Sequence, residues 1–471
     1  MNELDSGERR ALTRPNGKRR APAPRKAGGA LAQKRGGKVP DRLILTAALA
    51  LVAATPLVAA PAPATPSTTV ATASAESARR LSRVQSLLDR YVAEGRAPGL
   101  VVALGQGDEA PRFAAAGRLS DAAGAPAAGA DSLWRIYSMT KPITAIAVMM
   151  LVEEGRIDLD QPVADVIPAF AHMRVLDAPQ ASLASHPARR PVTIRHLLTH
   201  TGGLAYQFLG TSPLHREYRR LGLLGGRADA EASRSQPATL AAFAERAARL
   251  PLLAEPGTEW HYSIGTDVLG RVIEVVSGLP FDRFVATRLL EPLGMNSTFW
   301  TVPGTAAGRL ATSYAWVDER RVAVDPGRGS AWLQPPRLHY GGSGLVSSAR
   351  DYDRFLQMLA GGGSIGGVRI LKPETVRLSM SNLLPAGVRV VGDGAPDTAR
   401  AEGFGAGGWV YLADVPGGVG AGTYGWFGAA GTVAFIDPKH GLRVTLMANY
   451  FPANKWPLHG DLVRAVYSPA T

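Results

Sequence analysis

Strand-like segments lie near both ends of the chain and enclose a long, mainly helical middle, and this layout constrains the fold more than any other feature. Residues 99–104 and 112–117 are predicted to form two strands joined by a turn. Residues 408–412, 433–437 and 442–447 form a second strand-rich stretch near the other end. We therefore expect an α+β fold: an antiparallel sheet assembled from both ends of the chain and flanked by helices, with an all-helical subdomain inserted at approximately residues 138–330.

The folded body is expected to span residues 78–471. Residues 61–77 are rich in Pro, Ala, Ser and Thr, and such a composition predicts a flexible linker because it has few apolar side chains to repay the entropy of ordering. An amphipathic helix should follow and stop at Gly95. Its apolar positions recur at helical spacing: Leu81, Val84, Leu87, Leu88, Tyr91 and Val92.

The basic charge of the chain is concentrated at its N-terminal end. The net charge is +13, and residues 1–42 alone hold twelve Lys and Arg against four Asp and Glu. This basic tail is rich in Gly, Pro and Ala and carries no nucleic-acid-binding motif. We therefore expect no nucleic-acid partner.

Residues 1–60 have the order of an export signal, in which a basic segment precedes an apolar run over residues 43–54 and then small residues. Pro56 interrupts the apolar run, which favours cleavage over a stable transmembrane helix. We expect export to the periplasm or the medium, with membrane contact only if the segment stays as an uncleaved anchor.

The chain contains no cysteine, which excludes disulfides, a thiol nucleophile and a lipoprotein attachment site. Its chemistry must use oxygen, nitrogen or a metal. Ser138 and Lys141 stand at the start of an apolar, and therefore buried, helix and lie on one of its faces. A lysine amine there can accept the serine proton, whereas an arginine could not because its guanidinium stays protonated.

The segment Ser138-Met139-Thr140-Lys141-Pro142 resembles the active-site motif of serine β-lactamases, penicillin-binding proteins and related carboxylesterases. Segments 196–204, 291–295 and 341–351 extend the resemblance in the same order, and it covers most of residues 85–450. The resemblance implies a β-lactamase/transpeptidase-like catalytic domain over residues 78–471, with Ser138 as the acylated nucleophile and Lys141 as its proton-transfer partner.

Two further elements of this family have counterparts in the chain. Tyr262 matches the catalytic tyrosine, but Ile264 stands where a β-lactamase has the Asn that binds the substrate amide. The stretch 424–432 matches the third element, with Trp426 in place of the usual cation. The resemblance implies that the amides of Ser138 and Ala429 form the oxyanion hole and that Gly428 lets the substrate approach closely.

The two departures make the resemblance nearest to β-lactamase-like carboxylesterases of the family VIII type. The implied activity is that of a serine hydrolase without a cofactor, acting on a small-molecule ester, amide or lactam, with weak or no β-lactamase activity. A β-lactamase, a D-Ala or D-amino acid peptidase and an acyltransferase of the same fold are alternatives. A non-catalytic peptidoglycan-binding scaffold is disfavoured, because a binder needs no buried amine beside a hydroxyl.

Two other motifs in the sequence are disfavoured as functional sites. His196 and His200 have the i, i+4 spacing of zinc ligands on a helix, but no Glu follows His196 and no third ligand is evident, which favours capping and packing roles and no metal. The segment 341–344 resembles a nucleophile elbow, but Leu345 occupies the position where the elbow requires Gly.

Overall fold

A seven-stranded antiparallel sheet, with strand order β11-β12-β13-β14-β15-β1-β2, forms the centre of the computed structural model. The structure describes residues 68–227, 235–391 and 403–468. Two strands come from the N-terminal end, β1 (Gly99–Gln106) and β2 (Arg112–Gly117). The other five are β11 (Gly403–Phe404), β12 (Trp409–Val410), β13 (Tyr424–Phe427), β14 (Val433–Asp437) and β15 (Leu442–Met447). The sheet is thus assembled from both ends of the chain, which confirms the expected fold class.

Strands β1 and β15 pair side by side in this sheet. Their register sets Val101 opposite Met447 and Leu104 opposite Val444, and all four side chains are buried. The sequence of β1 is apolar from Leu100 to Leu104, as expected for a strand buried on both faces, whereas β15 alternates apolar residues with Arg443 and Thr445, which are also buried. This pairing joins the N-terminal and C-terminal parts of the domain in one sheet.

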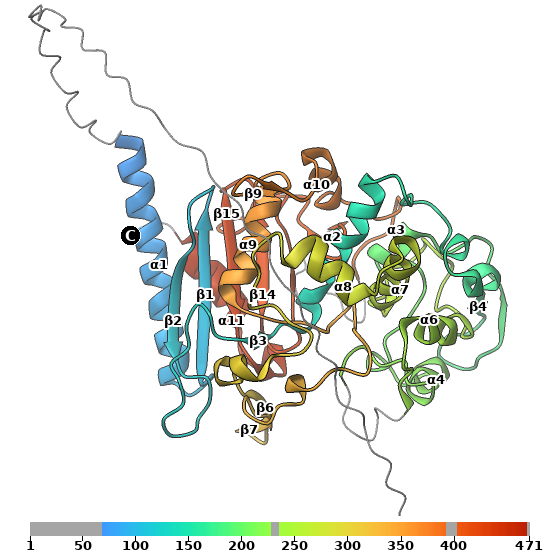
Figure 1. Cartoon of the computed structure of the whole chain (residues 1–471), viewed down its shortest axis with the longest axis horizontal. Coiled ribbons are helices and arrows are strands. Elements are labelled where there is room, and N and C mark those ends of the chain that lie inside the picture. The colour runs from blue at the N-terminus through green and yellow to red at the C-terminus, as the bar shows by residue number, and fades with distance from the viewer. Residues whose placement is uncertain (1–67, 228–234, 392–402, 469–471) are drawn as a thin grey trace, which may run out of the picture. The chain divides into compact units, whose positions relative to one another are not determined.

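Three helices cover the sheet. Helix α1 (Thr68–Ala93) packs against β1, β2 and α11 (Leu458–Tyr467), whereas α9 (Ala349–Ala360) packs against β1, β14 and β15 (Figure 1). Helix α1 takes in residues 68–77, so this part of the linker expected over 61–77 is helical, whereas residues 61–67 lie outside the described residues. Glu76 forms ion pairs with three arginines one to two turns further on, so this stretch gains contacts that its composition does not reveal.

The inserted region lies on the side of the molecule away from α1 (Figure 1). Its helices are α2 (Thr140–Glu153), α3 (Ile194–Leu198), α4 (Pro213–Arg220), α6 (Leu240–Ala248), α7 (Gly265–Ser277) and α8 (Phe281–Val285). It is not purely helical, because it also holds the pair β4 (Arg174–Leu176) and β5 (Ser185–Pro187), and the strands β6 (Ser313–Val317) and β7 (Arg320–Asp325).

Short elements connect the two parts. Strand β3 (Trp134–Arg135) pairs with β8 (Val346–Ser347), β9 (Ser364–Ile365) with β10 (Val368–Arg369), and β16 (Tyr450–Phe451) with β6. Helix α10 is Pro373–Ser379. The β3–β8 pair matters for function because it fixes the chain directly before Ser138.

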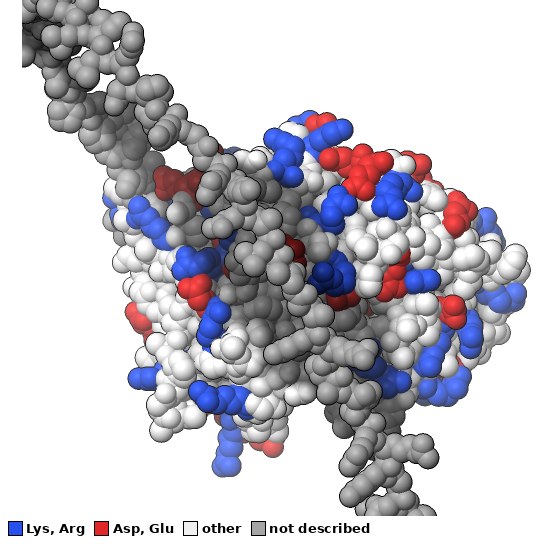
Figure 2. All heavy atoms as spheres, viewed as in Figure 1, with Lys and Arg blue, Asp and Glu red and all other residues white. Residues whose placement is uncertain are grey.

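Basic and acidic side chains are interspersed on the face shown in Figure 2. The strongly basic segment 1–42 and the apolar run 43–54 lie outside the described residues, so the expectation of export stays a prediction. Among the residues that the structure describes, no helix combines the length and the apolar character needed to cross a membrane.

Candidate active site

Ser138 sits in a short helical turn, Tyr137–Met139, that leads directly into α2. The preceding residue, Tyr137, has φ 41°, a left-handed conformation that is strained for a bulky side chain. Such strain is typical of functional sites and here turns Ser138 to a half-buried position at the start of the helix. Helix α2 itself is buried from Thr140 to Leu151, as its all-round apolar sequence predicts.

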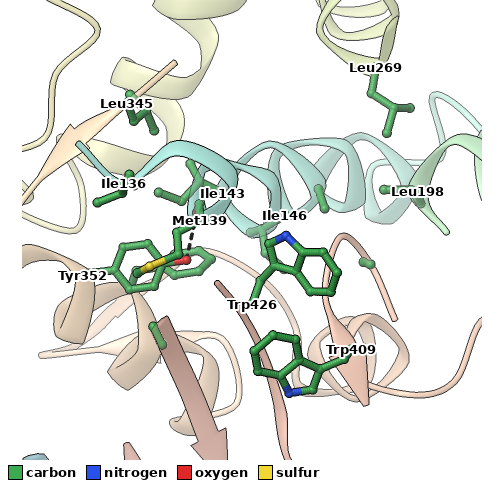
Figure 3. Close-up of a cluster of buried hydrophobic side chains, with 14 of the residues drawn as sticks. Ile136, Met139, Ile143, Ile146, Leu198, Leu269, Leu345, Tyr352, Trp409 and Trp426 are labelled. Atoms are coloured by element: carbon green, nitrogen blue, oxygen red, sulfur yellow. Dashed lines mark hydrogen bonds between the residues drawn. The ribbon is translucent and has the colours of Figure 1, made fainter. Parts of the chain in front are cut away.

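Helix α2 is held between the two parts of the domain. Figure 3 shows Ile143 and Ile146 on the helix, with Tyr352 of α9 and Trp426 of β13 beside it. The Tyr352 hydroxyl donates a hydrogen bond to the carbonyl oxygen of Met139 over 2.9 Å. The residue next to Ser138 is therefore anchored from outside the helix, which limits movement of Ser138.

The three predicted catalytic side chains meet in the structure. Tyr262 OH donates a hydrogen bond to Ser138 Oγ over 2.7 Å, and Lys141 Nζ lies 3.3 Å from the same oxygen. Lys141 is completely buried and Tyr262 is 7% exposed. One serine hydroxyl thus has two buried groups within proton-transfer distance.

Lys141 is positioned by the backbone of Gly342, in the loop before β8. Its Nζ donates a hydrogen bond to the Gly342 carbonyl over 2.8 Å, while the Gly342 amide donates to Asp267 Oδ1 over 2.8 Å. A Cβ at position 342 would lie 2.8 Å from Tyr206 OH and 2.9 Å from Asp267 Oδ2. Only glycine fits between the lysine and these two side chains.

Asp267, near the start of α7, is a buried carboxyl at the back of the site. Burial raises its pKa to about 6, and the positive charge of Lys141 opposes this rise. Asp267 is therefore ionised at neutral pH, where it balances the charge of Lys141 through the intervening Gly342 peptide, and it becomes neutral in mild acid.

Aromatic rings surround Tyr262 and fix its plane. Trp260 is stacked on it with ring centroids 6.0 Å apart, and His200 meets it edge-on at 4.9 Å. Trp426 Nε1 donates a hydrogen bond to the phenol oxygen over 3.4 Å. The phenol therefore has one donor directed at its oxygen and one acceptor, Ser138, for its proton.

His200 braces the Tyr262 segment from behind. Its carbonyl accepts a hydrogen bond from the His261 amide over 2.8 Å, and its Nδ1 lies 3.1 Å from Ser263 Oγ. Burial lowers the pKa of His200 well below its usual value, so the ring stays neutral at physiological pH. Its φ of 59° is left-handed, another local strain next to the site.

The other predicted site residues differ in how far they are exposed to solvent. Ala429 is exposed, whereas Trp426 and Ile264 are completely buried and offer no surface to a substrate. A Cβ at Gly428 would overlap Ile136 O and Thr432 Oγ1, so the absence of a side chain at Gly428 allows close approach of the protein's own backbone. That Gly428 also lets the substrate approach stays a prediction.

The expected roles at 264 and 426 therefore change. Ile264 packs in the hydrophobic core, and the polar atom of Trp426, its Nε1, is directed at the Tyr262 hydroxyl.

The sequence did not single out Gly342, Asp267 or Tyr206 as site residues. Asp267 could have been predicted from the sequence, because it is an acidic residue on the apolar face of a helix that begins just after Tyr262. Gly342 lies in the family-like segment 341–351, but its role could not be predicted, because it contributes a backbone carbonyl 201 residues away from Lys141 in sequence.

The histidine pair takes capping and packing roles. His196 and Thr193 form a reciprocal capping box at the start of α3, and that helix ends at Leu198, so His200 does not lie on its face. Within the described residues, no group of three or more His, Asp or Glu side chains is arranged to hold a metal ion. In the segment that resembles a nucleophile elbow, the hydroxyl of Ser343 donates a hydrogen bond to the carbonyl oxygen of Gly225 over 2.7 Å.

Known proteins similar to this chain carry the same fold. The family model described as Beta-lactamase matches residues 84–467. Protein Rv1367c of Mycobacterium tuberculosis is 37% identical over 331 residues, which are 68% of this chain and 78% of that protein. Esterase EstB of Burkholderia gladioli is 31% identical over 417 residues, which are 84% of this chain and 97% of the esterase.

Among solved structures, EstCE1, a hydrolase with promiscuous acyltransferase activity, matches with a TM-score of 0.69 and 26% identity, over 84% of this chain and all of EstCE1. The sheet built from both chain ends, the buried lysine beside the serine at the start of α2, and the match over residues 84–467 agree. The chain belongs to the Beta-lactamase family.

Proposed function

We propose that the protein is a serine hydrolase that cleaves carboxylic esters through an acyl-enzyme on Ser138. The observation that carries this proposal is the position of Ser138 Oγ, 2.7 Å from Tyr262 OH and 3.3 Å from Lys141 Nζ. Both partners are buried, so their protons move in a site from which bulk water is largely excluded.

Lys141 can act as the base of acylation only in its deprotonated form. The amine takes the proton of Ser138 as Oγ forms a bond to the ester carbonyl carbon, and the carbonyl oxygen becomes an oxyanion. When the tetrahedral intermediate collapses, the bond between carbon and the leaving oxygen breaks. Tyr262 gives that oxygen its proton and is reprotonated from the Lys141 ammonium, and the Trp426 N–H stabilises the phenol oxygen meanwhile.

The oxyanion is assigned to the backbone amides of Ser138 and Ala429. The loop that carries Ala429 follows β13, which packs against the turn that carries Ser138. Because Gly428 has no side chain, this loop can lie directly against Ile136 O. Preorganised amides of this kind are worth roughly 2.7–4 kcal/mol each in transition-state stabilisation.

Deacylation repeats these steps with water. Tyr262 and Lys141 accept a proton from the water as its oxygen attacks the acyl carbon, and the bond from carbon to Ser138 Oγ breaks. The proton returns to Oγ, and the free acid leaves.

Esters are favoured over β-lactams because Ile264 and Trp426 stand at the two positions where a β-lactamase holds the lactam's amide and carboxylate, and neither offers the substrate a polar group. The side chains at 264 and 426 are buried and apolar or engaged with Tyr262. A site without matching polar groups discriminates against substrates that need them.

A hydrolysis panel tests this proposal. We expect kcat/KM for p-nitrophenyl esters to exceed that for nitrocefin by about a hundredfold or more, which corresponds to roughly 2.7 kcal/mol of transition-state binding. D-alanyl peptides belong in the same panel. Equal constants, or a preference for nitrocefin, would return the chain to the β-lactamases proper.

We also propose that the protein is exported, on the order of basic, apolar and small residues in 1–60. Cell fractionation of the full chain tests this. Mature protein that begins after residue 54 outside the cytoplasm supports the proposal, and full-length protein in the cytoplasm contradicts it.

A further inference from the structure

A cavity of about 770 Å³ opens beside Tyr262. The larger part of its wall is apolar and includes Ala205, Leu209, Leu253, Trp260, Val388 and Val391. Polar side chains line the rest, among them Gln180, Thr258, Glu259, His261 and Arg389. A volume of this size is in the range of sites that bind drug-sized molecules, roughly 300–1,000 Å³. It is far larger than a methyl or ethyl group requires.

The position of the cavity relative to the catalytic groups is one-sided. Of the residues at the site, Tyr206 and Tyr262 line it, whereas Ser138, Lys141 and the oxyanion segment 424–432 do not. In an acyl-enzyme mechanism the carbonyl oxygen points to the oxyanion amides, and the leaving oxygen points to the group that protonates it. The group that protonates it here is Tyr262, so the cavity lies on the side of the leaving alcohol.

We propose that this cavity binds the alcohol part of the ester, and that the natural substrate is an ester of a large, mostly apolar alcohol. The inference rests on the proposed acyl-enzyme mechanism and adds the class of substrate to it. Selectivity should therefore follow the size of the alcohol, and the acyl group should matter less.

The same cavity can also bind a second substrate, an alcohol that accepts the acyl group. After acylation the alcohol leaves the cavity, and another large alcohol can enter it in place of water. Its hydroxyl proton passes to Tyr262 and Lys141 as its oxygen bonds to the acyl carbon, the bond to Ser138 Oγ breaks, and Oγ regains the proton. The products are a new ester and the free enzyme, so large apolar alcohols should act as acyl acceptors.

Two ester series test the inference. One keeps an acetyl group and varies the alcohol from ethyl to cyclohexyl and naphthylmethyl, and the other keeps ethanol and lengthens the acyl chain. Each methylene that the cavity removes from water contributes about a fourfold gain. We expect kcat/KM to rise by about a hundredfold or more across the alcohol series and by less than about tenfold across the acyl series.

Two variants narrow the cavity. Val391 is 60% exposed at its mouth and Leu209 is half-buried in its wall, so Val391→Trp and Leu209→Trp fill space without opening the core. The matched control is Val368→Trp, which adds the same indole to the exposed strand β10, outside the cavity. We expect the ratio of kcat/KM for the naphthylmethyl ester to that for ethyl acetate to fall by about tenfold or more in both cavity variants and to keep its wild-type value in the control.

The outcomes separate this inference from the proposed function. If no ester is hydrolysed in a Ser138-dependent way, the proposed function fails. If esters are hydrolysed but the acyl series shows the larger gain, or the cavity variants lower turnover of both series equally, the cavity does not bind the alcohol and the inference is wrong while the function stands.

Discussion

Replacing Tyr262 with Phe separates catalysis from packing at this site. The ring stays stacked on Trp260 and in contact with His200, because those contacts involve the ring and not its oxygen. The substitution removes two hydrogen bonds, the one to Ser138 Oγ at 2.7 Å and the one from Trp426 Nε1 at 3.4 Å. At about 0.5–1.5 kcal/mol each, their loss leaves most of the folding free energy intact.

The effect on turnover should be much larger. A positioned acid–base group contributes about 10²–10⁴ in rate, or roughly 2.7–5.4 kcal/mol of transition-state stabilisation. We expect Tyr262→Phe to lower kcat/KM for alkyl esters by this factor, while Tm shifts by only a few degrees.

The assay compares leaving groups. A p-nitrophenolate leaves without being protonated, whereas an alkoxide needs the Tyr262 proton. The loss in Tyr262→Phe should therefore be at least about tenfold smaller for a p-nitrophenyl ester than for an alkyl ester with the same acyl group. An equal loss for both esters would show that Tyr262 does not protonate the leaving group, and a loss below about tenfold for the alkyl ester would refute its catalytic role altogether.

Three further substitutions test the surroundings of Ser138. Lys141→Arg should inactivate as fully as Lys141→Ala, by about 10²-fold or more in kcat, because guanidinium cannot act as a base; near-normal turnover would reduce the lysine to an electrostatic support. Gly428→Ala should lower kcat by about tenfold or more, because the added methyl displaces the oxyanion loop from Ile136 O, whereas Gly304→Ala, in open space, should have no effect. In Asp267→Asn the pH dependence of stability should change, since the wild-type pKa rises from 3.8 to about 6 on folding.

The direction of that last effect follows from linkage. The folded protein holds the Asp267 proton more tightly than the unfolded chain does, so the wild type loses stability as pH rises through this window. Asparagine can still accept from the Gly342 amide but does not titrate. Between about pH 4.5 and about pH 7.5 the variant should gain on the order of 2–3 kcal/mol relative to wild type in denaturant unfolding, and no relative change would contradict the shifted pKa.

The fold could be predicted closely where local pattern and burial agree. Strands β1, β2, β14 and β15 fall on the segments expected from apolar and β-branched runs, and α2 is buried on all sides as its sequence indicates. The start of α1 could not be predicted, because ion pairs from Glu76 stabilise a stretch whose composition resembles a linker.

Only those site residues that belong to family motifs could be predicted from the sequence. Ser138, Lys141 and Tyr262 converge because family motifs place them, but a motif match does not say where neighbouring side chains point. Ile264 and Trp426 match substrate-binding positions and yet turn into the core. Gly342 acts through its backbone, which no side-chain pattern can reveal.

The central claim is that turnover passes through an acyl group on Ser138. Intact-protein mass spectrometry after treatment with a fluorophosphonate, followed by peptide mapping, tests it most directly. We predict one adduct on the wild-type protein, on the peptide that contains Ser138, together with no adduct and no ester hydrolysis in Ser138→Ala. An adduct on Ser138→Ala, or a wild-type adduct on Ser263 or Ser343, would contradict the account.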